Sequence, residues 1–141
     1  MIRIPALTAA AAVLCLSALP GLANEMERVP PVTHPATQKE CGECHMAFQP
    51  GLLPAQSWNR IMDGLADHFG DNASLPADAV ADIRAYLTAN AGRGDGTLLR
   101  ITEQRWFVHE HRKRHLGNRA KSFADCQACH QDAARGLYED D

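Results

Sequence analysis

The 141-residue sequence has few aromatic side chains, no second long apolar run after its first 23 residues, and no strong excess of charge. Aromatic residues make up 6% of the chain, charged residues make up 22%, and the formal net charge is −3. Length excludes a large multidomain enzyme, hydropathy excludes a protein with several membrane spans, and composition excludes a collagen-like or low-complexity chain. The mild acidity argues against a general nucleic-acid binder. What remains is a small globular protein unusually rich in Cys and His.

The first 23 residues have the features of an export signal. Arg3 precedes an apolar run over residues 6–19, and Gly21-Leu22-Ala23 offers small residues at the positions that a signal peptidase reads. We expect residues 1–23 to be cleaved and the mature chain, residues 24–141, to lie in the periplasm without a membrane span. An uncleaved anchor is the alternative, because residues 4–23 are just long enough to cross a bilayer.

Every cysteine of the expected mature chain lies in a Cys-x-x-Cys-His motif. The two motifs are Cys41, Cys44 and His45, and Cys126, Cys129 and His130. Two thiols at this spacing can form thioether bonds to the two vinyl groups of one haem, and the next imidazole then points at the iron. We therefore expect two covalently bound haem c groups, with His45 and His130 as one iron ligand each.

Three other interpretations of the cysteines remain. Two disulfides would close very small loops and leave both histidines unexplained. A thioredoxin-type redox site needs a strand before the motif and a βαβ frame, and the sequence shows neither. A zinc site built from the Cys pairs is the third.

Apolar spacing predicts helices rather than strands. A helix is expected from about Ala55 to Phe69, ended by residues 70–72, because apolar residues recur at helical spacing: Trp58, Ile61, Met62, Leu65 and Phe69. A second is expected to start at an N-cap Ser74 and to bury Val80, Ile83 and Leu87. A third should run from a cap at Thr102 to about His115, where Gly117 ends it. Ser122 and Asp125 form a weaker capping pattern for a helix that holds the second motif.

The fold class should therefore be all-α, with two haem-binding halves. Residues 90–96, NAGRGDG, are the clearest break in the chain, so we divide it into a first region over residues 24–95 and a second over residues 96–141. Each haem would supply much of the core that so short a region cannot build alone.

The second axial ligand of each iron should project from an apolar helical face. His68 follows Ile61 and Leu65 on one predicted stripe, which makes it the best candidate. In the third helix His111 has the more apolar neighbours, with His109 and His115 as alternatives. His34 is expected at the surface, and the methionines are not expected to be iron ligands. The simplest pairing is His45 with His68 and His130 with His111, and the crossed arrangement remains open.

Three stretches resemble the dihaem cytochrome c family of photosynthetic and other proteobacteria. They are the segment that begins ECGECHMAFQPGLLPAQSW and continues through HFGDNASL, the later RITEQRWFVHEHR, and the closing DCQACHQDAARGLYEDD. The resemblance covers nearly all of the chain after about Lys39 and also favours His111. It implies a small helical bis-His dihaem cytochrome c whose partners are redox proteins, either a small oxygen-binding monohaem cytochrome c or a membrane cytochrome b.

The leading hypothesis is a periplasmic carrier of single electrons rather than an enzyme. A small dihaem peroxidase or nitrogen-oxide reductase would need one open haem site and distal acid–base groups. A gas or redox sensor is a third hypothesis. Residues 100–121 carry seven Lys and Arg against two Glu, so this band either pairs with haem propionates or docks an acidic partner.

Overall fold

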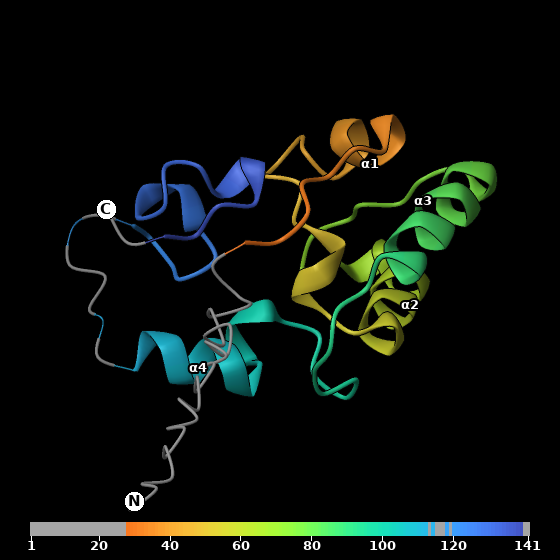
Figure 1. Cartoon of the computed structure of the whole chain (residues 1–141). Coiled ribbons are helices and arrows are strands. Elements are labelled where there is room, and N and C mark those ends of the chain that lie inside the picture. Colours follow the sequence, from red (N-terminus) through yellow and green to blue (C-terminus); the bar gives the residue numbers. More distant parts are fainter. Residues whose placement is uncertain (1–27, 113, 115–117, 119, 140–141) are drawn as a thin grey trace, which may run out of the picture.

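The computed structural model describes residues 28–112, 114, 118 and 120–139 (Figure 1). Across these ranges the chain forms four α-helices and no named strand, although isolated β-bridges occur. The helices are α1 (Pro35–Glu40), α2 (Ala55–Asp63), α3 (Ala77–Ala89) and α4 (Arg105–His111). Short 3₁₀ turns lie between and after them: η1 (Pro50–Leu52), η2 (Leu65–Asp67), η3 (Ile101–Glu103), η4 (Cys126–Ala128) and η5 (Ala133–Arg135). The predicted all-α class is confirmed.

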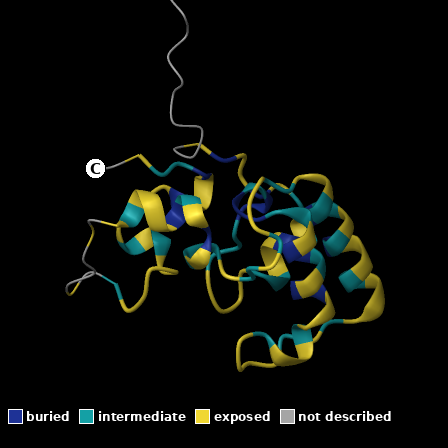
Figure 2. Ribbon diagram, turned by 90° about the horizontal axis from the view of Figure 1, so that it is seen from below, coloured by how far each residue is buried: buried dark blue, intermediate teal, exposed yellow. Residues whose placement is uncertain are grey.

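The main apolar core lies between α2 and α3, which run side by side in Figure 1. Trp58, Ile61 and Met62 of α2 and Ile83 and Leu87 of α3 are all buried in it. Figure 2 shows the buried positions gathered where the two helices meet, with exposed residues on their outer faces. The predicted spacing on both helices thus identified most of the core, although Val80 is only partly buried.

Helix α2 ends earlier than predicted. Gly64 is its C-cap and donates its backbone N–H to the carbonyls of Arg60 and Ile61. Glycine in a helix interior costs about 1 kcal/mol relative to alanine, which favours an end at this position. The chain continues as η2, so His68 and Phe69 lie outside the helix that was predicted to hold them.

The second and third predicted helices also begin later than expected. Pro76, not Ser74, is the N-cap of α3. A helix capped by Ser74 would have to begin at Leu75, and a residue before a proline avoids helical geometry. Thr102 lies in η3, and α4 begins after Gln104. The buried amide of Gln104 exchanges two hydrogen bonds with the backbone of Asp95, at 2.9 and 3.0 Å, and holds this residue in extended geometry. The predicted end of this helix, at His115 and Gly117, lies outside the described residues.

The second Cys-x-x-Cys-His motif forms a single tight turn instead of the predicted helix. Its 3₁₀ turn η4 has no side-chain cap, although Ser122 accepts a hydrogen bond from the Ala124 N–H at 3.1 Å. The His130 N–H donates to the Cys126 carbonyl at 2.8 Å and closes the turn. The motif's two cysteines and its histidine therefore lie in one short turn.

The C-terminal segment packs against the start of the described chain (Figure 1). The Val29 N–H donates to the Gly136 carbonyl at 2.8 Å, and Gly136 has a φ of 78°. A Cβ at Gly136 would lie 1.8 Å from the Val29 carbonyl oxygen, so this close approach requires glycine.

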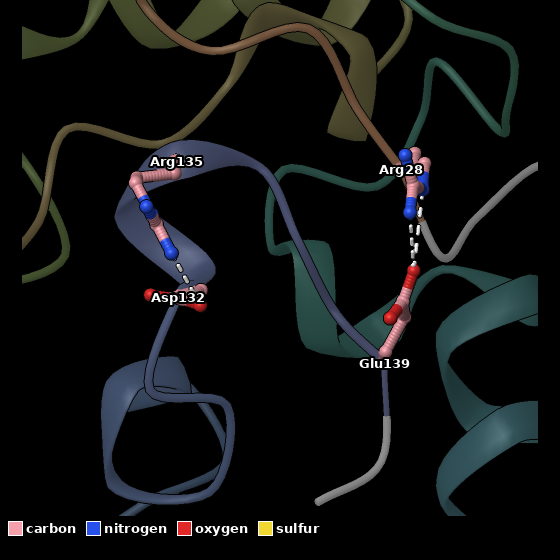
Figure 3. Close-up of polar contacts among 4 residues, drawn as sticks. All are labelled: Arg28, Asp132, Arg135 and Glu139. Atoms are coloured by element: carbon pink, nitrogen blue, oxygen red, sulfur yellow. Dashed lines mark hydrogen bonds and ion pairs between the residues drawn. The ribbon is translucent and has the colours of Figure 1, made fainter.

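Figure 3 shows two exposed ion pairs in the same region. Arg28 pairs with Glu139 at 2.8 Å, and Arg135 pairs with Asp132 at 2.5 Å. Exposed pairs contribute little stability, so the backbone contact and the burial around it hold the two ends together.

The buried amide of Gln49 joins the two predicted regions. Its Nε2 donates to the Ala133 carbonyl at 2.7 Å, and its Oε1 accepts from the Tyr138 hydroxyl at 2.5 Å.

The division into residues 24–95 and 96–141 stays a prediction. The proposed leader, residues 1–23, lies outside the described residues, and no described helix has the length and hydropathy to cross a membrane.

Candidate haem-iron centres

The first Cys-x-x-Cys-His motif follows directly on helix α1. Cys41 is the C-cap of this helix and donates its N–H to the Thr37 carbonyl at 3.0 Å. Its thiol is partly buried, and burial raises its pKa, whereas Cys44 is exposed. The described cysteines are all free thiols, so the structure does not contain the two disulfides considered above.

The ring of His45 is oriented by a backbone carbonyl and by an aromatic side chain. Its Nδ1 lies 2.8 Å from the carbonyl oxygen of Met46, which can only accept a hydrogen bond, so Nδ1 carries the proton. The ring stacks on Phe48 with centroids 4.9 Å apart. In the neutral tautomer with this hydrogen bond Nε2 carries no proton and is the nitrogen that can bind a metal ion.

His68 faces His45 across a gap. The two ring centroids are 6.2 Å apart and the ring planes differ by 30°. Burial is the main cause that lowers the pKa of His68, with smaller contributions from the charges of His45 and Arg100. A lowered pKa favours the neutral imidazole, the protonation state that a metal ligand requires.

A tight turn, not a helix, holds His68 in place. The His68 N–H donates to the Asp71 carbonyl at 2.7 Å, and the Asp71 N–H donates back to the His68 carbonyl at 3.3 Å. Phe69 and Gly70 between them have φ values of 58° and 107°. Two consecutive positive φ values are typical of the type I′ hairpin turn.

The second motif has a corresponding pair of rings. His130 lies opposite His111 with ring centroids 6.2 Å apart and planes at 86°. Its Nδ1 is 3.5 Å from the Glu139 carbonyl oxygen, and its ring contacts Tyr138 edge to face. Burial raises the pKa of the Cys126 thiol in this motif to about 11.

His111 is held by the helix turn before it. Its Nδ1 lies 2.9 Å from the Phe107 carbonyl oxygen, and its ring stacks on the Phe107 ring with centroids 3.9 Å apart. Phe123 meets the same imidazole edge to face at 5.9 Å. As with His45, the protonated Nδ1 leaves Nε2 as the nitrogen available to a metal ion.

The other described histidines are engaged elsewhere. His34 was expected at the surface but is partly buried, because its Nδ1 caps α1 and its ring stacks on Tyr86 with centroids 4.8 Å apart. His109 is 64% exposed and lies 3.1 Å from the Glu110 carboxylate. His115 lies outside the described residues. Pro35, at the first position of α1, is the feature of the sequence that favours a helix start directly after His34.

The two ring pairs fit iron coordination. Two imidazole nitrogens that each lie about 2 Å from one metal ion, on opposite sides, place their ring centres about 6 to 6.5 Å apart. Both observed separations, His45–His68 and His111–His130, are 6.2 Å.

Among the described residues no group of three or more His, Cys, Asp or Glu side chains could hold a metal ion, so the zinc interpretation has no support there.

A polar hollow of about 370 Å³ opens beside His68. Its lining includes Arg60, Phe69, Leu99 and Arg100. Arg60 donates to the Thr97 carbonyl at 2.7 Å, and Arg100 lies over the Phe69 ring at 4.1 Å. Guanidinium groups at this place are suited to pair with carboxylates such as haem propionates.

The helical fold and the two motifs define the class of small c-type cytochromes with two haems. The dihaem cytochrome c family matches residues 37–138, and the chain belongs to this family. It therefore carries two covalently bound haem c groups and transfers electrons through them. No curated protein matches the chain.

Three solved structures are similar to this chain. A crystal structure of DHC purified from Rhodobacter sphaeroides is 46% identical, covers 76% of this chain and 98% of its own, and has a TM-score of 0.70. A second structure, of the diheme cytochrome c from Rhodobacter sphaeroides, is 40% identical, with coverages of 77% and 99% and a TM-score of 0.72. A diheme cytochrome c from Shewanella baltica OS155 is 36% identical, with coverages of 74% and 86% and a TM-score of 0.68.

Proposed function

We propose that this chain is a periplasmic carrier of single electrons in which both haem irons are ligated by two histidines. In this proposal Cys41 and Cys44 attach the first haem, and Cys126 and Cys129 attach the second. The axial ligands are His45 with His68 and His130 with His111. The observation that carries the proposal is the equal separation of 6.2 Å in both ring pairs.

The same observation favours the direct pairing over the crossed one. Each motif histidine has its partner ring at the separation that a shared metal ion requires. In the first pair the partner comes from the turn at residues 68–71, and in the second from helix α4. Each proposed pair therefore lies within one of the two predicted regions.

The chain's own contribution is to orient the ligands. Backbone carbonyls accept the Nδ1 protons of His45 and His111, at 2.8 and 2.9 Å, and so select the tautomer with a bare Nε2. Aromatic rings pack against two of the ligands, since Phe48 stacks on His45 and Phe107 stacks on His111. A bound haem supplies the one-electron chemistry.

Two histidines on each iron leave no coordination position for a substrate. This arrangement suits an electron carrier with relatively low potentials, whereas a peroxidase, a nitrogen-oxide reductase or a gas sensor needs an open position. We therefore favour electron transfer without catalysis.

The location and the partners are part of the proposal. The leader features of residues 1–23 support export to the periplasm. Redox proteins are the proposed partners, and the family resemblance implies a small oxygen-binding monohaem cytochrome c or a membrane cytochrome b. Arg105 and Arg112 are exposed in the basic band, where complementary charge would speed transient encounters.

The ligands can be tested by removing them one at a time from the holoprotein. In His68→Ala and in His111→Ala we expect one haem of the two to become high-spin and, once reduced, to bind carbon monoxide. His109→Ala is the matched control, because His109 shares a helix with His111 but points to Glu110. If either alanine variant kept both irons six-coordinate and low-spin, that histidine would not be a ligand.

A further inference from the structure

The turn that carries His68 has an unusual residue at its tip. Among the described residues Phe69 is the one non-glycine residue with a positive φ, at 58°. This left-handed region favours Gly, Asn and Asp, because a Cβ crowds the backbone there. The paired backbone hydrogen bonds of His68 and Asp71 offset part of this cost, and contacts of the Phe69 ring can offset more.

Arg100 makes that contact from a distant part of the chain. Its guanidinium carbon lies 4.1 Å from the centroid of the Phe69 ring, within the range of a cation–π interaction. The Phe69 ring also meets the His68 ring edge to face, with centroids 4.8 Å apart. The ring of Phe69 thus lies in contact with both the proposed ligand and the arginine.

The nearest carboxylate does not account for the position of Arg100. Its Nε is 3.9 Å from Glu103, and both side chains are about half exposed, at 50% and 52%. An exposed pair at this separation contributes little. The Phe69 ring is therefore the closer partner.

We propose that Arg100 is a positioning residue for His68 and acts through Phe69. By stacking on the ring, the guanidinium holds the turn at residues 68–71 in the geometry that aims the His68 imidazole at His45. Loss of this contact lets the turn relax, so His68 leaves the iron more often. This inference rests on the proposed ligation of the first haem by His68.

The test measures how often His68 leaves the iron. In the reduced holoprotein carbon monoxide can bind the first haem only while His68 is dissociated, so the binding rate reports the open fraction. We expect Arg100→Ala and Phe69→Ala each to raise this rate about two- to fivefold, the range for an exposed cation–π contact. The double variant should bind no faster than the faster single variant, because both changes remove one contact.

Two further variants separate stacking from charge. Phe69→Tyr keeps an aromatic face and should retain the parent rate. Arg93→Ala removes an exposed positive charge on the loop at residues 90–96 and should also leave the rate unchanged. A rise in Arg93→Ala equal to that in Arg100→Ala would mean that charge alone acts, and would overturn the proposal.

The result can be separated from a failure of the ligand assignment. His68→Ala should open the first haem completely to carbon monoxide. If it does not, the proposed ligation is wrong. If His68→Ala opens the haem while Arg100→Ala and Phe69→Ala keep the parent rate, only the positioning role is overturned. The same holds if the effects of Arg100→Ala and Phe69→Ala on the binding rate multiply in the double variant.

Discussion

At the scale of single residues, the contacts of each imidazole ring separate the candidate ligands from the other described histidines. His45 and His111 give their Nδ1 protons to backbone carbonyls, whereas His109 points to a carboxylate and His34 caps a helix. The ring contacts therefore distinguish the described histidines from one another, which the count of seven in the sequence does not. The apolar neighbours of His111 in the sequence correspond to a real contact, since Phe107 stacks on its ring.

The angle between ligand planes predicts two different signals in electron paramagnetic resonance. His45 and His68 differ by 30°, so the first ferric haem should give the rhombic low-spin signal of nearly parallel ligands. His111 and His130 are at 86°, so the second should give the strongly anisotropic signal of perpendicular ligands. His68→Ala should abolish the rhombic signal and His111→Ala the anisotropic one. Two rhombic signals in the parent protein would contradict the geometry of the second pair.

At the scale of elements, apolar spacing predicted the buried faces of α2 and α3 but not where the helices end. Spacing reports which side of a helix is buried, and Trp58, Ile61 and Ile83 are indeed in the core. The ends depend on tertiary contacts or on single residues: Gln104 bonds Asp95, and Gly64 stops α2.

His68 shows how a site residue can be predicted for an incomplete reason. In the sequence His68 falls on the predicted helical stripe of Ile61 and Leu65. The structure places it after a 3₁₀ turn, in a hairpin at residues 68–71, yet still facing His45. The positive φ of Phe69 could not be predicted, because phenylalanine rarely adopts it and the Arg100 side chain that contacts its ring lies far along the chain.

The loop at residues 90–97 gives a pH-dependent prediction at this scale. Asp95 accepts from the Thr97 hydroxyl at 2.6 Å and from its N–H at 2.8 Å, and these bonds hold the pKa of Asp95 below its usual 3.8. A lowered folded-state pKa gives stability that is present above about pH 3.8 and is lost as pH falls through the folded value.

Thr97→Val removes the stronger of these bonds. It should lower the free energy of unfolding at neutral pH, and the difference from the parent protein should shrink as pH drops below 3.8. Urea unfolding at a series of pH values measures this. A difference that stayed constant down to pH 2 would show that the hydroxyl acts through packing and not through the carboxylate.

At the scale of the whole molecule, the buried apolar side chains are distributed unequally between the two predicted regions. Most buried hydrophobic side chains of the described residues lie between Val29 and Leu87, and beyond residue 96 only Phe107 and Ala133 join them. The second predicted region therefore has little core of its own, as expected for a segment that packs around a haem. Gln49 and the contact of Val29 with Gly136 attach it to the first region.

The central claim is that neither iron has an open coordination position. The most direct test is the optical spectrum of the holoprotein, ferric and then reduced, with and without carbon monoxide. We predict two low-spin haems that show no prompt change when carbon monoxide is added to the reduced protein, and any binding at the first haem should be slow because it waits for His68 to dissociate. A high-spin band, or prompt binding of carbon monoxide at one haem, would contradict bis-His ligation and favour an enzyme or a sensor.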